Sequence, residues 1–304
     1  MTGQYNRIDI ATGRDGVALE QNPLGGPVLR LEAAGGIALI ALQGGQVIGW
    51  TPKGHAPVIW MSPTERLANP PEKPKPVRGG TPVCWPWFAA HPSDAAKPAH
   101  GFVRTRQWTV DRAERSASGV RVTLATATTD ADKALWPNEA ALELIVTLGD
   151  DLTLALATHN TGISAFALTQ ALHTYFAVSD ISNVLVEGFD RQTYLDKLDS
   201  GVRKQQTGPI AFAAEVDRIY DAHQGMATVI DRGLNRRIEI TKSGSHSTVV
   251  WNPWIEKCKR LGDMGPDGYR TMVCVETCNA GDDVVTLAAG ASHTMVASYR
   301  VSHI

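Results

Sequence analysis

The sequence lacks the short motifs of the commonest nucleotide-binding and hydrolytic sites. GxGxxG between a strand and a helix, GxxxxGK[ST], HExxH and GxSxG are all absent. This argues against a dinucleotide-dependent dehydrogenase, a P-loop kinase, a zincin and an α/β-hydrolase. We therefore expect a function that uses neither a cofactor nor a metal ion.

Cysteine is scarce and apolar runs are short. The four cysteines, Cys84, Cys258, Cys274 and Cys278, are too scattered for a disulfide scaffold and form no CxxC pair. A zinc site at Cys274 and Cys278 is a weaker interpretation, because no histidine motif accompanies them. No apolar run reaches the roughly 20 residues of a membrane span, and residues 1–16 lack the apolar core of a signal peptide. We expect a cytoplasmic protein with no membrane contact.

Excess charge of either sign is also missing. Lysine and arginine total 29 and aspartate and glutamate 31, giving a net charge of −2 and a pI near 6.5. This balance gives no general attraction to nucleic acid or to an anionic membrane.

Amphipathic helices of three turns or more are hard to find, whereas strand patterns recur. Residues 120–128, 142–148 and 152–158 are rich in β-branched residues and partly alternate, and the last two predict a hairpin. Residues 227–240 predict a second hairpin, and residues 284–301 repeat the pattern. Hairpins without intervening helices favour an all-β, antiparallel sandwich. With no internal repeat, we predict one domain over residues 1–304.

Segment 62–82 contains six prolines and two adjacent glycines, a composition typical of a loop. Alone it resembles a domain linker. Apolar, aromatic sequence follows at once in VCWPWFA, so we interpret it as a long loop within the domain. Long loops inside compact domains are usually functional.

Four stretches place polar, titratable residues among apolar or aromatic ones. His173 lies in the strand-like run ALHTYF, where an unpaired buried imidazole would be costly. Glu276 lies in VCVET; partial burial would make it a better base near neutral pH, but a salt-bridged structural glutamate fits equally. Asp217 in EVDRIY is a site candidate or a surface partner of Arg218. His100 precedes a glycine, as a solvated loop residue also would.

Three arginines lie in or beside aromatic stretches: Arg78 in RGGTPVCWPWF, and Arg104 and Arg106 in HGFVRTRQW. A guanidinium can grip a phosphate with two parallel hydrogen bonds, although exposed strand ends explain these residues as well. Paired tryptophans, Trp85 with Trp87 and Trp251 with Trp254, suit the CH face of a sugar or the packing of a core.

Taken in order, RGGTPVCWPWF, HGFVRTRQW, ALHTYF, EVDRIY, VVWNPWIEK and VCVET resemble the aldose 1-epimerase superfamily. More narrowly they resemble its glucose-6-phosphate 1-epimerases, or hexose-6-phosphate mutarotases. The resemblance runs from about Val77 to Ala280. It implies a galactose-mutarotase-like antiparallel β-supersandwich with few short helices, and a sugar cleft on one sheet.

The resemblance also implies roles. His173 would be the general acid that protonates the ring oxygen, and Glu276 the general base at the C1 hydroxyl. Ring opening removes one proton from O1 and gives one to O5, so an acid and a base on opposite sides suffice. His100 and Asp217 would hold sugar hydroxyls, while Arg78 and Arg104 would grip the 6-phosphate. The implied reaction interconverts the α and β anomers of a hexose 6-phosphate without a cofactor.

The sequence leaves alternatives open. A mutarotase of unphosphorylated aldoses would give Arg78 and Arg104 no partner, and a glycoside hydrolase using Asp217 and Glu276 would leave His173 unexplained. A non-catalytic sugar-phosphate-binding protein is the remaining alternative. Which hexose 6-phosphate is preferred, whether Arg106 shares the phosphate, and what Ala99 changes at a possible substrate contact are not decided. The resemblance favours a monomer.

Overall fold

The computed structural model describes residues 6–7, 9–10, 13, 15–22, 24–65, 67 and 75–304. Strands dominate this part of the chain, and its single α-helix, α1 (Trp254–Leu261), spans eight residues. The predicted all-β architecture with few short helices is confirmed. Of the loop predicted over 62–82, residues 66 and 68–74 lie outside the described residues. No helix in the described ranges is long and apolar enough to cross a membrane.

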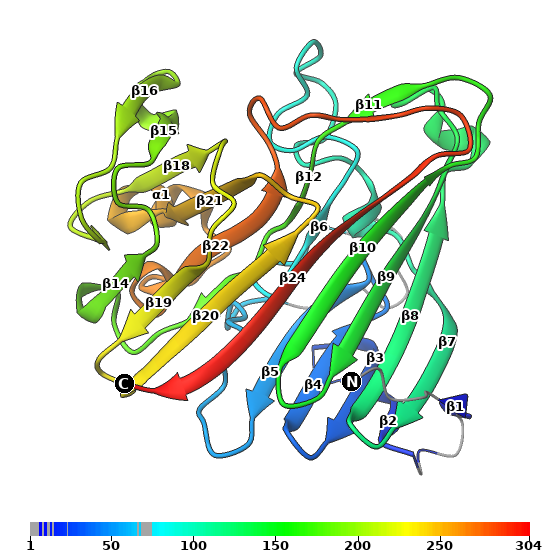
Figure 1. The fold of residues 1–304 in the computed structure, drawn as a ribbon, viewed down its shortest axis with the longest axis horizontal. Coiled ribbons are helices and arrows are strands. Elements are labelled where there is room, and N and C mark those ends of the chain that lie inside the picture. The colour runs from blue at the N-terminus through cyan, green and yellow to red at the C-terminus, as the bar shows by residue number, and fades with distance from the viewer. Residues whose placement is uncertain are drawn as a thin grey trace.

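A long antiparallel sheet runs diagonally through the molecule (Figure 1). Its ten strands lie in the order β1-β7-β8-β9-β10-β24-β20-β19-β14-β17. Their bounds are β1 (Asn6–Arg7), β7 (Thr109–Ser116), β8 (Gly119–Ala127), β9 (Ala140–Leu148), β10 (Leu152–Asn160), β24 (Ser292–His303), β20 (Arg236–Ser243), β19 (Ala227–Asp231), β14 (Val184–Glu187) and β17 (Ile210–Ala211).

Three smaller sheets complete the described fold. A four-stranded sheet has the order β2 (Val17–Asn22), β3 (Gly26–Ala33), β4 (Gly36–Ala41) and β5 (Gln46–Pro52). An eight-stranded sheet has the order β16 (Val202–Gln205), β15 (Thr193–Asp196), β18 (Val216–Tyr220), β21 (Ser247–Asn252), β22 (Met272–Asn279), β12 (Gln170–Leu172) and β6 (Val83–Cys84), with β13 (Tyr175–Ala177) also paired to β22. β11 (Phe166–Leu168) pairs with β23 (Val285–Leu287).

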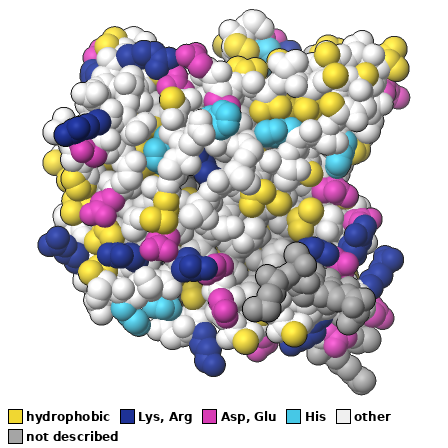
Figure 2. All heavy atoms as spheres, in the orientation of Figure 1, with side chains coloured by type: hydrophobic (Ala, Val, Ile, Leu, Met, Phe, Trp, Pro, Cys, Tyr) yellow, Lys and Arg dark blue, Asp and Glu magenta, His cyan; other side chains and the backbone are white. Residues whose placement is uncertain are grey.

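The long sheet packs against both larger companions. β3 contacts β8 and β9, β4 contacts β9, and β22 contacts β24. Figure 1 shows β3, β4 and β5 behind β8 and β9. Leu144 of β9, Leu31 of β3 and Val275 of β22 belong to one buried apolar cluster, so hydrophobic burial joins the sheets. On the face seen in Figure 2, side chains of opposite charge are interspersed, in keeping with the small net charge.

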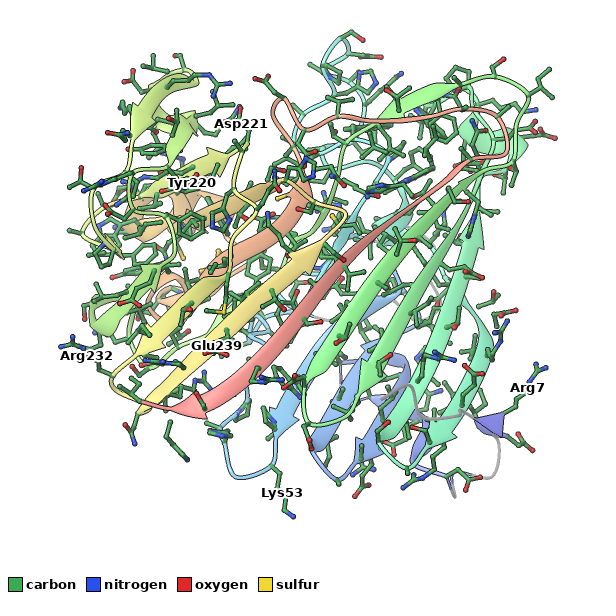
Figure 3. The ribbon with its side chains drawn as sticks, in the orientation of Figure 1. Arg7, Lys53, Tyr220, Asp221, Arg232 and Glu239 are labelled. Carbon is green, nitrogen blue, oxygen red and sulfur yellow. The ribbon has the colours of Figure 1, made fainter. Side chains whose placement is uncertain are left out.

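The predicted hairpins are confirmed in two cases and wrong in one. β9 pairs with β10, and β19 pairs with β20 through a turn at whose tip the exposed Arg232 lies (Figure 3). Residues 284–301 do not form a hairpin. β23 pairs with β11, while β24 crosses to lie between β10 and β20. Alternation marked both segments as strands, but the partners are distant in sequence and local pattern does not encode them.

β22 is the strand that positions the site, because every one of its residues is buried. Val273 and Val275 point into the core shared with the long sheet. Cys274, Glu276 and Cys278 alternate with them and face the other side. A carboxyl is therefore held on the otherwise apolar floor of the eight-stranded sheet.

The loop carrying His100 and Arg104 depends on Gly101. Its φ is +72°, and an added Cβ would lie 1.8 Å from the carbonyl oxygen of Trp85. We predict that Gly101→Ala lowers the free energy of unfolding by more than about 3 kcal/mol, since left-handed strain adds to a backbone overlap. Urea unfolding followed by tryptophan fluorescence measures this.

Gly201→Ala is the matched control. Its φ is +77°, but an added Cβ there meets nothing within 4 Å. Only the conformational cost applies, so we expect a loss of about 1 kcal/mol. Equal losses in the two variants would show that the contact with Trp85 does not matter.

Candidate active site

A cleft of about 680 Å³ opens on the face of the eight-stranded sheet that carries Glu276. It collects all six residues predicted from the sequence: Arg78, His100, Arg104, His173, Asp217 and Glu276. They come from segments spread over some 200 residues of chain, and the fold brings them to one place.

His173 and Glu276 contact each other directly. Leu172 pairs with Thr277 and Tyr175 with Cys274, so the residues between them place His173 opposite Glu276. His173 Nε2 lies 3.4 Å from Glu276 Oε1, and the side chains are 12% and 1% exposed. The acid and the base that the sequence predicts are thus neighbours on one sheet.

Burial sets the protonation of this pair. It raises the pKa of Glu276 well above the ordinary value, with repulsion from Asp217 adding to the effect. Burial also lowers the pKa of His173 well below its ordinary value, helped by His100, Arg78 and Arg104. An ionised Glu276 would raise the pKa of His173, but a protonated carboxyl supplies no charge to do so. Burial therefore favours the neutral forms of both side chains, a carboxylic acid beside an uncharged imidazole.

Tyr175 supports the imidazole from behind. Its ring stacks on that of His173 with centroids 4.9 Å apart and an interplanar angle of 11°. Arg78 Nη1 donates to the Tyr175 hydroxyl at 2.8 Å, and Asp263 accepts from Arg78 Nε and Nη2 at 3.0–3.1 Å. Arg78 thus lies in the cleft, but much of its guanidinium already donates hydrogen bonds to Tyr175 and Asp263.

His100 is a neutral hydrogen-bond donor. Ala89 N–H donates to His100 Nδ1 at 3.2 Å, so the ring proton is on Nε2. Burial and the charges of Arg104 and Arg78 lower its pKa to about 3. His100 is therefore not a solvated loop residue. Its ring lies 5.5 Å from that of His173.

Asp217 projects from β18 into the cleft and is not a simple surface partner of Arg218, whose guanidinium donates to Gln206. Burial raises the pKa of Asp217, against the opposing charges of Lys257 and Lys197. Lys257 itself lies 3.0 Å from Glu215. The Asp217 carboxylate is suited to accept hydrogen bonds from ligand hydroxyls.

Arg104 and Arg106 have different surroundings. Arg104 lines the cleft, its Nη2 donates to the carbonyl of Ala99 at 2.8 Å, and its Nε has no hydrogen-bond partner among the described residues. Arg106 does not line the cleft. Its guanidinium lies 2.5 Å from Asp132 and donates to the carbonyl of Ala127. Of these two arginines, only Arg104 can meet an anion in the cleft.

The paired tryptophans mostly pack the core. Trp85 and Trp87 are buried with Phe102, and Trp254 packs against the same cluster. Trp251 alone of the four lines the cleft, with its ring 6.0 Å from that of His173. It is the candidate for an apolar sugar contact.

Sequence reasoning missed several cleft residues, among them Tyr175, Lys197, Lys257 and Asp263. The period of two along a strand places Tyr175 on the same face as His173, and Cys274 on that of Glu276. Asp263 carried no signal, because its partner Arg78 is 185 residues away. His173, Cys274 and Glu276 hold ligand atoms within 4.8 Å of one another, the geometry of a candidate metal site.

Comparisons with known proteins show the family. The model of the aldose 1-epimerase family matches residues 27–300. An Escherichia coli K12 protein provisionally named glucose-6-phosphate 1-epimerase is 35% identical over 246 residues, covering 81% of this chain and 80% of that protein. A Cenchrus ciliaris protein with the same provisional name is 36% identical over 263 residues, covering 83% and 78%.

The fold agrees as well. The crystal structure of a provisionally named mutarotase from Salmonella typhimurium superimposes with a TM-score of 0.87 at 28% identity, covering 99% of this chain and 97% of that one. The predicted galactose-mutarotase-like supersandwich is confirmed.

Glu276→Gln tests the buried pair through stability. The ordinary pKa of this carboxyl is 4.5 and the folded value is raised, so above pH 4.5 folding requires uptake of a proton. Stability is lost as pH rises from there toward the folded pKa, and glutamine removes this loss. We expect Glu276→Gln to raise the free energy of unfolding at pH 8 and to raise it less at pH 4.5. Urea titration at the two pH values measures both changes.

The exposed Glu20→Gln is the control, with an expected change within about 0.5 kcal/mol at either pH. A gain for Glu276→Gln that is the same at both pH values would contradict the assigned burial of an ionisable carboxyl.

Proposed function

The chain belongs to the aldose 1-epimerase family, and we propose that it interconverts the α and β anomers of hexose 6-phosphates, glucose 6-phosphate first among them. The observation that carries this proposal is that a buried His173–Glu276 pair shares its cleft with Arg104, whose Nε is unpartnered. A phosphate gives this guanidinium a charged partner, whereas a neutral sugar gives none.

The pair supplies the acid and the base that ring opening requires. Transfer of the carboxyl proton of Glu276 to His173 creates a carboxylate beside an imidazolium. The carboxylate takes the proton of the C1 hydroxyl, the O1–H electrons form the C1=O1 double bond, and the C1–O5 bond breaks. O5 takes the proton of His173.

Rotation about C1–C2 followed by the reverse steps closes the ring on the other face. O1 and O5 are bonded to the same carbon. An acid and a base in contact with each other therefore suit this reaction, and the 3.4 Å separation of His173 and Glu276 supports it.

The other cleft residues hold the sugar. His100 donates from Nε2 and Asp217 accepts, so together they complement hydroxyl groups. Arg104 is the principal phosphate ligand. Arg78 assists with the N–H groups that Asp263 and Tyr175 leave free, while Arg106 takes no part.

One buried cluster runs through all three large sheets, which supports the prediction of one domain over residues 1–304. The monomeric state and the cytoplasmic location stay predictions.

The direct test follows anomerisation of freshly dissolved α-glucose 6-phosphate by exchange NMR, with α-glucose in parallel. We expect acceleration of the phosphorylated sugar. His173→Ala and Glu276→Ala should each lower kcat by about 10²–10⁴-fold, because each removes one proton-transfer group. Calorimetry should still detect glucose 6-phosphate binding.

His159 is a half-buried histidine on the long sheet, outside the cleft, and His159→Ala should keep full activity. If His173→Ala kept the full rate of anomerisation, His173 would not be the general acid. Acceleration of neither sugar by the native protein would favour a binding protein, and acceleration of both alike would favour a mutarotase of unphosphorylated aldoses.

Arg104→Ala and Arg106→Ala separate the phosphate ligand from its neighbour. Loss of a charged hydrogen bond to phosphate should raise KM for glucose 6-phosphate by about 10- to 100-fold in Arg104→Ala. Arg106→Ala should leave KM unchanged, since its guanidinium is bound to Asp132 outside the cleft. Steady-state anomerisation rates measure both.

Residual activity on unphosphorylated glucose should not fall in Arg104→Ala. Equal losses on the two sugars would mean that Arg104 supports the loop and does not bind the phosphate.

A further inference from the structure

The thiol of Cys274 has no role in the proposed reaction, yet it lies against the catalytic pair. Cys274 precedes Glu276 by two residues on β22, so both side chains leave the same face of the strand. One ligand atom each from His173, Cys274 and Glu276 lie within 4.8 Å of one another. No other group of three such side chains occurs in the described part of the chain. Cys278 does not belong to this group of three side chains. The candidate metal site therefore consists of His173, Cys274 and Glu276, and not of Cys274 with Cys278.

A second feature points to a ligand here. Glu276 is 1% exposed, and its Oε2 has no hydrogen-bond partner among the described residues. His173 Nδ1 is likewise buried and without a partner in the same part of the structure. Buried polar atoms are costly when they remain unpaired, so atoms of this kind mark a place where something binds.

Thiolate, imidazole and carboxylate together form a donor set that Zn²⁺ prefers. Its bonds to sulfur, nitrogen and oxygen are about 2.3, 2.0 and 2.1 Å, so atoms within 4.8 Å need converge by only about 1 Å to share one ion. Three protein ligands leave one tetrahedral position open. His173 and Glu276 line the cleft and Cys274 does not, so an ion held by the three would border the space where the sugar would bind.

We propose that His173, Cys274 and Glu276 form a binding site for Zn²⁺, and that the bound ion inhibits the enzyme by occupying its acid and its base. The inhibition rests on the proposed function, whereas the binding of the ion does not. Cys274 is the determinant of this site, because it contributes a ligand that turnover does not need.

Binding is tested first without any activity measurement. Co²⁺ replaces Zn²⁺ as a spectroscopic probe and gives a thiolate-to-cobalt charge-transfer band when a cysteine ligates it. We expect this band in the native protein, its loss in Cys274→Ser, and its retention in Cys278→Ser. Cys278 is the matched control, a fully buried thiol on the same face of β22 that lies outside the group.

Activity on glucose 6-phosphate then tests inhibition. Cys274→Ser should turn over like the native protein, and its half-inhibitory Zn²⁺ concentration should rise at least about 10-fold, the loss of one ligand's contribution. Cys278→Ser should keep native sensitivity to Zn²⁺.

A native protein without the cobalt band, or one whose band and Zn²⁺ sensitivity survive in Cys274→Ser, would overturn the site. The band in the native protein needs no variant, so the proposal stays testable if Cys274→Ser fails to fold. If the band is present but no form of the protein accelerates anomerisation, the metal site stands and the proposed function fails.

Discussion

The structure depends on one constraint, the burial of a carboxyl and an imidazole against each other in the floor of a sheet. Burial raises the pKa of Glu276 and lowers that of His173, so it drives both toward their neutral forms. The arrangement is costly for stability, since an apolar pair at these positions would need no proton uptake. Because the two side chains are only 3.4 Å apart and line the cleft, a proton donor and a proton acceptor lie close together there.

The surrounding fold keeps this pair in place. β22 packs on the long sheet with one face, and on the other face Glu276 lies beside a second apolar cluster that includes Cys274 and Cys278. His173 lies between the end of β12 and the start of β13, and its backbone N–H donates to the backbone carbonyl of Pro82. Tyr175 stacks on the imidazole, and Arg78 holds the Tyr175 hydroxyl. Each of these contacts restricts rotation of the side chain that must meet the sugar.

The sequence predicts those features that a local pattern encodes. Alternation identifies the strands and two hairpins, and a lone titratable residue in an apolar strand identifies His173 and Glu276 as unusual. Pairings between distant segments are not encoded locally. Arg78 with Asp263, Arg106 with Asp132, and β24 between β10 and β20 all join residues far apart in the chain. The three arginines therefore looked alike in sequence, although the fold gives each a different partner.

The arginines also link the phosphate to the acid. Burial, and after it the charges of His100, Arg78 and Arg104, lower the pKa of His173 and so oppose the protonated form that would donate to O5. On the proposed function, a phosphate dianion bound at these arginines cancels much of that charge. This would remove part of what lowers the pKa of His173 and so favour its protonated form. On the same proposal, a phosphorylated sugar would strengthen the acid–base pair that acts on it, whereas a free sugar would leave the arginine charges uncompensated. Selection for the phosphorylated sugar would then be expressed in the rate as well as in binding.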